Sequence, residues 1–228
     1  MNISPGPVVA IMQPYFFPYA GYFRLLVAAD VFIVLDDVQF PRRGRVHRSE
    51  ISEGGASRWL TLPLRRDGRD VRIKDIAFHA NARALLDRRL RQLPWLNSRS
   101  GSLAQPVSQI LHGSLETPYS SLEAGLSLVC RGLGLPAERF TSSSVEVDHN
   151  LRGEAYIIAL VKAVGGRTYV NAPGGRQLYN PANFSSEGIA LKFLRPYEGR
   201  FRYLLPALMT EPAAVLRADV FSTTALSP

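Results

Sequence analysis

The feature that most constrains the fold is a pair of short apolar runs joined by a helical segment. Residues 8–12 (VVAIM) and 31–35 (VFIVL) contain only apolar side chains, with no polar alternation. Such runs are typical of strands buried on both faces of a parallel sheet. Between them, residues 22–29 fill about two helical turns. A strand, a helix and a second strand in this order predict an α/β protein with a mostly parallel, Rossmann-like sheet.

Two carboxylates follow the second apolar run directly. Asp36 and Asp37 stand at the carboxyl end of that predicted strand, where ligands collect in open α/β sheets. A carboxylate there is suited to act as a general base, to orient an amine or to bind Mg²⁺. Adjacent strand residues point to opposite faces, so at most one of the two faces a given pocket. The alternative is structural, with one acid capping the next turn and pairing with Arg42 or Arg43.

A histidine in the loop that follows is the third catalytic candidate. His47 carries an imidazole, the side chain best suited to accept a proton near neutral pH. The alternative is a histidine that is merely exposed. His79, His112 and His149 show no spacing typical of a metal site, and the single cysteine, Cys130, is expected to be a small core residue. No metal site is predicted.

An aromatic loop follows the first apolar run. Residues 14–18 begin and end with proline and enclose three aromatics. We expect Tyr15, Tyr19 and Tyr22 to bind substrate, because a phenol can donate a hydrogen bond to a sugar hydroxyl while its ring stacks on a sugar or a base. Gln13, at the end of the strand, adds an amide. The phenylalanines are instead expected to plug the end of the sheet: Phe16, Phe17 and Phe23.

The formal charge of +8 comes almost entirely from arginine, which supplies 24 of the 27 basic residues. Eight arginines form two clusters: Arg42, Arg43, Arg45 and Arg48, then Arg65, Arg66, Arg69 and Arg72. Guanidinium groups bind phosphate and carboxylate well. Arg43 and Arg48 follow the acids closely and are predicted to bind a small anionic substrate, such as a nucleotide-linked sugar. A solvated basic surface is the alternative. The chain has no recognisable nucleic-acid module, so nucleic acid is not an expected partner.

The middle of the chain predicts an insertion into the α/β plan. Residues 49–53 and 58–64 are expected to pair as a hairpin, and a further strand is expected around 71–78. These strands make residues 45–78, approximately, a β-rich segment.

A helical region and two further strand ends complete the plan. Apolar positions at helical spacing run through residues 80–135, approximately. Later strands are predicted to deliver Ser143, Asn171 and Gly174 to the carboxyl edge, where they would bind substrate through a hydroxyl, an amide and an open backbone. For Ser143 the alternative is a turn residue. We expect residues 1–228 to form a single α/β domain.

The chain carries no sequence signal for a membrane or for export. No apolar run approaches the roughly 18 residues of a membrane span. The first residues, MNISPGP, lack the basic start and apolar core of a signal peptide. One cysteine excludes an internal disulfide and fits a reducing compartment. The predicted location is the cytoplasm.

Residues 12–23 (MQPYFFPYAGYF) and 30–40 (DVFIVLDDVQF) together resemble the signature of the WbqC-like family, which is associated with O-antigen and other polysaccharide gene clusters. Weaker similarity continues through 59–64 (WLTLPL) and 169–175 (YVNAPGG). The sequence departs from the family pattern before Arg48, where Arg45 and His47 replace Trp and Asn.

The resemblance implies an enzyme that transfers a small acyl or aminoacyl group, of the glycyl type, to an amine such as that of an amino sugar. It would serve surface-polysaccharide or related specialised metabolism. The implied donor is an acyl thioester, either acyl-CoA or a group bound to a carrier protein, which would then be a partner. Asp36, Asp37 or His47 would remove the proton of the amine, and Arg48 would polarise the acyl group. A homo-oligomer is also left open.

Two other functions stay open. The order of elements is similar to the first unit of the HxGH nucleotidyltransferases and related ATP-dependent ligases, which would imply Mg²⁺ and ATP. Here residues 19–22 (YAGY) stand at the HxGH position, and a neutral phenol brings no positive charge to a triphosphate. The third function is a non-catalytic binder of anionic glycan precursors.

Overall fold

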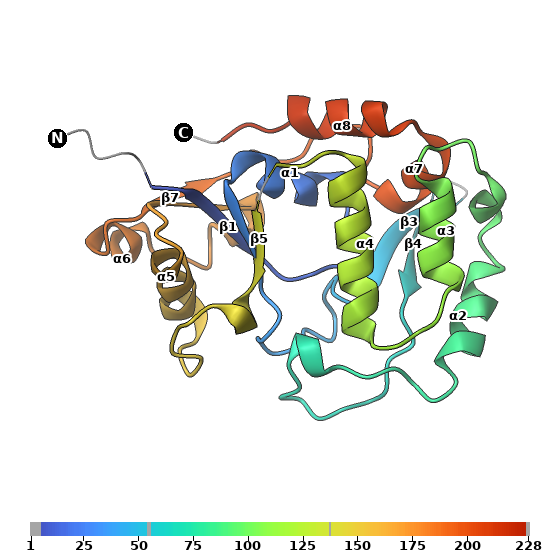
Figure 1. Ribbon diagram of the computed structural model, residues 1–228, viewed down its shortest axis with the longest axis horizontal. Helices are drawn as coiled ribbons and strands as arrows, with labels where there is room; N and C mark the ends of the chain where they lie inside the picture. Colours follow the sequence, from blue (N-terminus) through green and yellow to red (C-terminus); the bar gives the residue numbers. More distant parts are fainter. Residues whose placement is uncertain (1–5, 54–55, 137, 227–228) are drawn as a thin grey trace.

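The computed structural model describes residues 6–53, 56–136 and 138–226. Its main sheet has five strands in the order β5-β2-β1-β6-β7 (Figure 1). The strands are β1 (Val8–Met12), β2 (Val31–Val34), β5 (Glu138–Thr141), β6 (Thr168–Asn171) and β7 (Ala190–Phe193). Every pairing within this sheet is parallel. The predicted Rossmann-like α/β fold is confirmed.

The strand order reverses once, between β1 and β6. From β1 the chain moves outward to β2 and then β5, and it returns to the other side of β1 for β6 and β7. The connections that leave the carboxyl ends of β1 and β6 therefore run in opposite directions. In doubly wound sheets, this divergence opens a crevice in which ligands bind.

Helices cover both faces of the sheet (Figure 1). The described helices are α1 (Ala20–Ala28), α2 (Ala82–Leu90), α3 (Ala104–His112), α4 (Pro118–Gly132), α5 (Gly153–Ala163), α6 (Pro181–Ser186), α7 (Leu204–Thr210) and α8 (Ala213–Ser222). Of these, α1 packs on one face of the sheet, and α5 and α6 pack on the other. None of the described helices is long and apolar enough to cross a membrane.

Successive residues of the central strands pack on opposite faces. Val9 belongs to a buried cluster that includes Leu160 of α5 and Phe184 of α6. The next residue, Ala10, belongs to a cluster on the other face that includes Phe23 of α1. Both faces of β1 are therefore covered, which explains why its sequence is apolar throughout rather than alternating.

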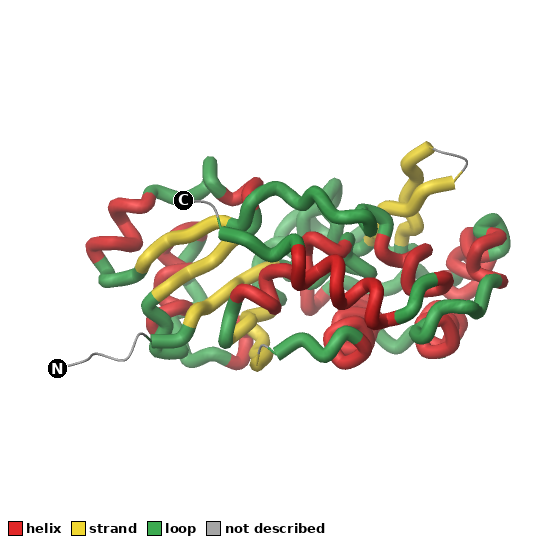
Figure 2. The backbone as a smooth tube through the Cα atoms, turned by 90° about the horizontal axis from the view of Figure 1, so that it is seen from above, coloured by secondary structure: helices red, strands yellow, loops and turns green. Residues whose placement is uncertain are grey.

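The predicted insertion forms a separate hairpin of β3 (Arg48–Glu53) and β4 (Ala56–Thr61). Figure 2 shows this hairpin and the parallel sheet toward opposite ends of the elongated molecule. The further strand expected around residues 71–78 is absent from the described structure. That segment makes isolated bridges and a 3-10 turn, Ile73–Asp75. The three-residue spacing of Ile73 and Ile76 explains the difference, because it lets a 3-10 turn bury both side chains on one side.

Candidate functional site

A cavity of about 490 Å³ opens where the strand order reverses. Its walls come from the end of β1, the aromatic loop and the segment after β6. We call it the switch-point cavity, and its lining includes Gln13, Tyr15, Tyr19, Tyr22, Arg45, Asn171, Gly174, Gly175 and Tyr179. Six of the residues predicted to bind substrate thus line one cavity.

The three tyrosines of this cavity differ in how their hydroxyls are used. The Tyr22 hydroxyl donates to the Gln13 carbonyl at 3.0 Å, and the residue is only 2% exposed. The Tyr15 hydroxyl lies 3.8 Å from the Met12 sulfur, a weak acceptor. No described group hydrogen-bonds to the Tyr19 hydroxyl. Burial raises the pKa of all three phenols, so they are neutral donors at physiological pH.

The aromatic loop is held by hydrogen bonds to the start of β3 and to the segment just before it. The Phe16 amide donates to the Val46 carbonyl at 2.9 Å, and the Ser49 hydroxyl donates to the Phe17 carbonyl at 2.8 Å. Phe16 and Phe17 are both 1% exposed, as a plug requires. Phe17 has a φ of 44°, an unusual backbone conformation for a bulky residue. Backbone strain of this kind is concentrated at ligand sites, where the surrounding structure enforces it.

The opposite wall is built from Asn171 and the glycine pair. The Asn171 side chain is buried, and its Oδ1 accepts a hydrogen bond from the Ala172 amide at 2.7 Å. A Cβ on Gly175 would overlap with Nδ2 of Asn171, so glycine is needed there. A Cβ on Gly174 would meet no atom within 4 Å, which leaves the backbone of Gly174 open to a ligand.

Arg45 is the cation that lines the switch-point cavity. Its Nη2 lies 2.8 Å from Oε2 of Glu50, and its Cζ lies 5.6 Å from the ring centre of Tyr19 and 5.1 Å from that of Trp59. Neither arginine predicted to bind substrate lines this cavity. Arg48 donates to the carbonyls of its own loop and stacks on Trp59 at 4.4 Å, whereas Arg43 is exposed.

The two adjacent aspartates face different environments. Asp36 is 2% exposed, and it accepts hydrogen bonds from the Ser142 hydroxyl, the Ser143 amide and the Ser143 hydroxyl at 2.7–2.9 Å. These bonds tie the end of β2 to the end of β5. Asp36 and Ser143 are therefore placed as structural partners, away from any of the cavities described here.

Asp37 instead joins a polar cluster that lines a second cavity, of about 350 Å³. Its Oδ2 lies 2.9 Å from His149 Nδ1 and accepts from the Tyr156 hydroxyl at 2.6 Å, while its Oδ1 accepts from Ser142 at 2.5 Å. Burial alone would raise the pKa of Asp37, but the hydrogen bonds from Ser142, Tyr156 and His149 outweigh burial and lower that pKa. Asp37 is thus a carboxylate that orients an imidazole.

The cavity of the dyad of Asp37 and His149 shares no lining residue with the switch-point cavity, but neighbouring residues of the same segments line the two cavities. Leu35 lines the switch-point cavity and Asp37 lines the cavity of the dyad. On α5, Ile157 lines the former and Tyr156 the latter. His149 stands 112 residues beyond Asp37 in the chain, and the sequence alone indicates no role for it.

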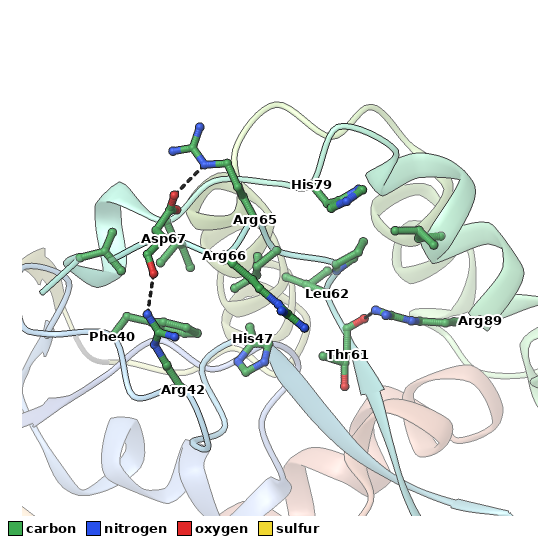
Figure 3. Close-up of a pocket in the computed structure, with 15 residues that line it drawn as sticks. Phe40, Arg42, His47, Thr61, Leu62, Arg65, Arg66, Asp67, His79 and Arg89 are labelled. Carbon is green, nitrogen blue, oxygen red and sulfur yellow. Dashed lines mark hydrogen bonds and ion pairs between the residues drawn. The ribbon is translucent and has the colours of Figure 1, made fainter. Parts of the chain in front are cut away.

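His47 lies in a third cavity, of about 410 Å³, which we call the arginine cavity (Figure 3). Its basic lining residues are Arg42, His47, Arg65, Arg66, His79 and Arg89. Burial, with the charges of Arg48 and Arg89, lowers the pKa of His47 to about 4. The three predicted catalytic residues Asp36, Asp37 and His47 therefore lie in three different environments.

Within the described ranges, no three His, Cys, Asp or Glu side chains gather closely enough to hold a metal ion. Cys130 is a buried residue of α4, and burial raises the pKa of its thiol to about 11. Its surroundings are those of a core residue.

Comparison with known proteins gives a family and a distant relative. The chain is 25% identical over 232 residues to an uncharacterized protein of Mycobacterium tuberculosis, Rv1507c, and the match covers 96% of this chain and 95% of the mycobacterial protein. No solved structure matches the chain. The family model of the WbqC-like proteins matches residues 13–204, which include the aromatic loop, both aspartates and the glycine pair. The chain belongs to the WbqC-like protein family.

Proposed function

We propose that this protein is a cytoplasmic enzyme that transfers a small acyl or aminoacyl group, of the glycyl type, to the amine of a small acceptor such as an amino sugar. The reaction would serve surface-polysaccharide or related specialised metabolism. The observation that supports a small-molecule site is the switch-point cavity, which combines aromatic rings, neutral donors and one guanidinium at the reversal of strand order.

The lining of this cavity suits a sugar or nucleotide that carries an anionic group. Tyr15 and Tyr19 offer ring faces for stacking and hydroxyls for hydrogen bonding. Arg45 supplies a positive charge that can bind a phosphate or polarise an acyl oxygen. In the proposed function Arg45 therefore takes the role that the sequence favoured for Arg48.

Proton transfer in this proposal uses the dyad. With Asp37 accepting the proton of His149 Nδ1, the Nε2 atom carries a lone pair and can accept a proton from the substrate ammonium group. The freed amine nitrogen forms a bond to the acyl carbon, and the bond to the thiol leaving group breaks. As the amide forms, the nitrogen gives up a second proton, which the thiolate takes up, and His149 releases the first proton to solvent. No covalent enzyme intermediate is needed.

ATP-dependent nucleotidyl transfer is the second candidate. The strand order and a cavity directly after β1 favour it, since nucleotides bind at this position in doubly wound folds. A requirement for Mg²⁺ and ATP would support this function and contradict direct acyl transfer.

A ligand screen tests the proposal. Thermal unfolding would be followed with nucleotides, nucleotide sugars and acyl-CoA, since a specific ligand raises the midpoint as its concentration rises. Release of free thiol from acyl-CoA would then be measured with an amino sugar as acceptor.

The variants Asp37→Asn and His149→Gln should retain ligand binding and lower turnover by roughly 100-fold or more. Asp70→Asn is the matched control, because Asp70 lines the same cavity outside the dyad. Full turnover in both dyad variants would refute the mechanism. Binding without turnover in the wild-type protein would favour a non-catalytic binder of glycan precursors.

A further inference from the structure

The arginine cavity shares no lining residue with the switch-point cavity. It lies between the segment that follows β2, the end of β4, the loop after β4 and helix α2 (Figure 3). The described lining contains four arginines and two histidines but a single acid, Asp67. The cavity therefore has a marked excess of positive charge.

Most of this charge is not balanced by a carboxylate. Among the described residues that line the cavity, one ion pair is present, between Arg65 Nε and Asp67 Oδ1 at 2.6 Å. Arg42 donates to the backbone carbonyl of Asp67, and Arg89 donates to the backbone carbonyl of Thr61. A carbonyl satisfies a donor but carries no net charge to neutralise the cation.

Arg66 is the least engaged of these side chains. No partner for its guanidinium is found among the described residues. In Figure 3 the Arg66 side chain extends into the cavity between His47 and Leu62. A guanidinium offers five donors in a planar fork, so Arg66 can present a pair of N–H groups to a ligand without breaking an internal contact.

His47 gives independent evidence that the cavity is electropositive. Its Nδ1 atom is buried without a hydrogen-bond partner among the described residues. Burial and the neighbouring charges of Arg48 and Arg89 disfavour protonation and so lower the pKa of His47. An anion in the cavity would reverse that balance, because it both neutralises the arginines and accepts from a protonated imidazole.

We propose that the arginine cavity binds the phosphoryl or diphosphoryl group of a small molecule. Arg42, Arg66 and Arg89 surround the anion with forked donors, and His47 contributes a further donor when it takes up a proton. Apolar walls formed by Leu62, Val71, Ile76 and Leu85 contact the remainder of the ligand. The site is independent of acyl transfer in the switch-point cavity.

Titration calorimetry of the full chain with pyrophosphate at low salt tests this inference. Arg66→Gln should weaken binding by about tenfold or more, as expected for the loss of a charge-assisted contact. Arg69→Gln is the matched control, since Arg69 is an exposed arginine of the same loop that does not line the cavity. It should change affinity by less than about twofold. Equal weakening in both variants would mean only general attraction to a basic surface and would overturn the proposal.

A second measurement locates the anion. The imidazole signal of His47, assigned with His47→Gln, would be followed by NMR against pH with and without pyrophosphate. Pyrophosphate should move the titration of His47 to higher pH, and Arg66→Gln should reduce that movement. If the titration midpoint of His47 is the same with and without pyrophosphate, the proposal is overturned, whatever the enzyme activity. Replacing pyrophosphate by inorganic phosphate tells whether one phosphoryl group suffices.

Discussion

Neutral hydroxyls and amides with one guanidinium line the switch-point cavity, whereas four arginines line the arginine cavity. The segment between Phe40 and β3 contributes to both, with Arg45 in the first and His47 in the second. In the first cavity a single guanidinium, which is paired with Glu50, acts beside the neutral donors, so recognition combines one charge with shape and hydrogen bonding. In the arginine cavity, recognition depends mainly on positive charge that no carboxylate neutralises. Neighbouring residues of one loop are thus used for two kinds of recognition.

The largest expected effect concerns the rigid wall of the switch-point cavity. Gly175→Ala should lower the free energy of unfolding by about 1–3 kcal/mol, because its Cβ would overlap with the buried Asn171 side chain. Gly174→Ala should be nearly neutral, since its Cβ meets open space. Urea denaturation measures both. Equal stability of the two variants would show that the Asn171 wall is adaptable.

A crossed pair of charge substitutions would separate the two cavities. Arg45→Gln should weaken a ligand of the switch-point cavity by about tenfold and leave pyrophosphate binding nearly unchanged. Arg66→Gln should do the reverse. Calorimetry with each ligand on each variant gives the four affinities. If either variant weakened both ligands alike, the two cavities would have to be parts of a single site.

The pH dependence of stability should depend on His47. Its pKa of about 4 in the folded protein lies below the ordinary 6.5, so between these values the unfolded chain binds more protons. The stability that this histidine contributes is therefore lost as pH falls from about 6.5 toward 4. His47→Gln should flatten the curve by about 1 kcal/mol, because solvent screens part of the shift. Denaturation at several pH values, with exposed His112→Gln as control, provides the measurement.

Repeating the denaturation series in the presence of pyrophosphate tests whether the anion binds beside His47. If the anion binds in the arginine cavity, it should raise the pKa of His47 and weaken the pH dependence in the wild-type protein. The His47→Gln protein should show no such change. An identical response of the two proteins would place the anion elsewhere.

The sheet was predictable from the sequence because it depends on local patterns. The runs at residues 8–12 and 31–35 are apolar on both faces, and both faces of β1 are covered by helices. The alternation rule also anticipated that Asp36 and Asp37 would separate, and one is enclosed by serines while the other lines a cavity. Where local spacing was ambiguous, as at Ile73 and Ile76, the prediction of a strand was wrong.

The dyad could not be predicted because it depends on long-range contacts. His149 follows the serines at the end of β5, and β5 pairs with β2, which ends near Asp37. Without the strand order, nothing local connects the two residues. His47 is much nearer to Asp37 in sequence, yet it lines a different cavity. Proximity along the chain was therefore a poor guide to which histidine accompanies the acid.

The smallest expected effect tests the idea that the switch-point cavity recognises ligands with neutral donors. Tyr19→Phe removes a hydroxyl that bonds to no described group, so stability should stay within about 0.5 kcal/mol while ligand affinity falls roughly two- to fivefold. Tyr22→Phe is the informative contrast. Its hydroxyl donates to the Gln13 carbonyl, so the loss should appear as about 1 kcal/mol of stability instead. Unfolding and binding measurements on both variants decide the matter: if Tyr19→Phe lost stability but no affinity, its hydroxyl would serve the fold, and the other residues that line the cavity, such as Tyr15 and Arg45, would have to supply the recognition.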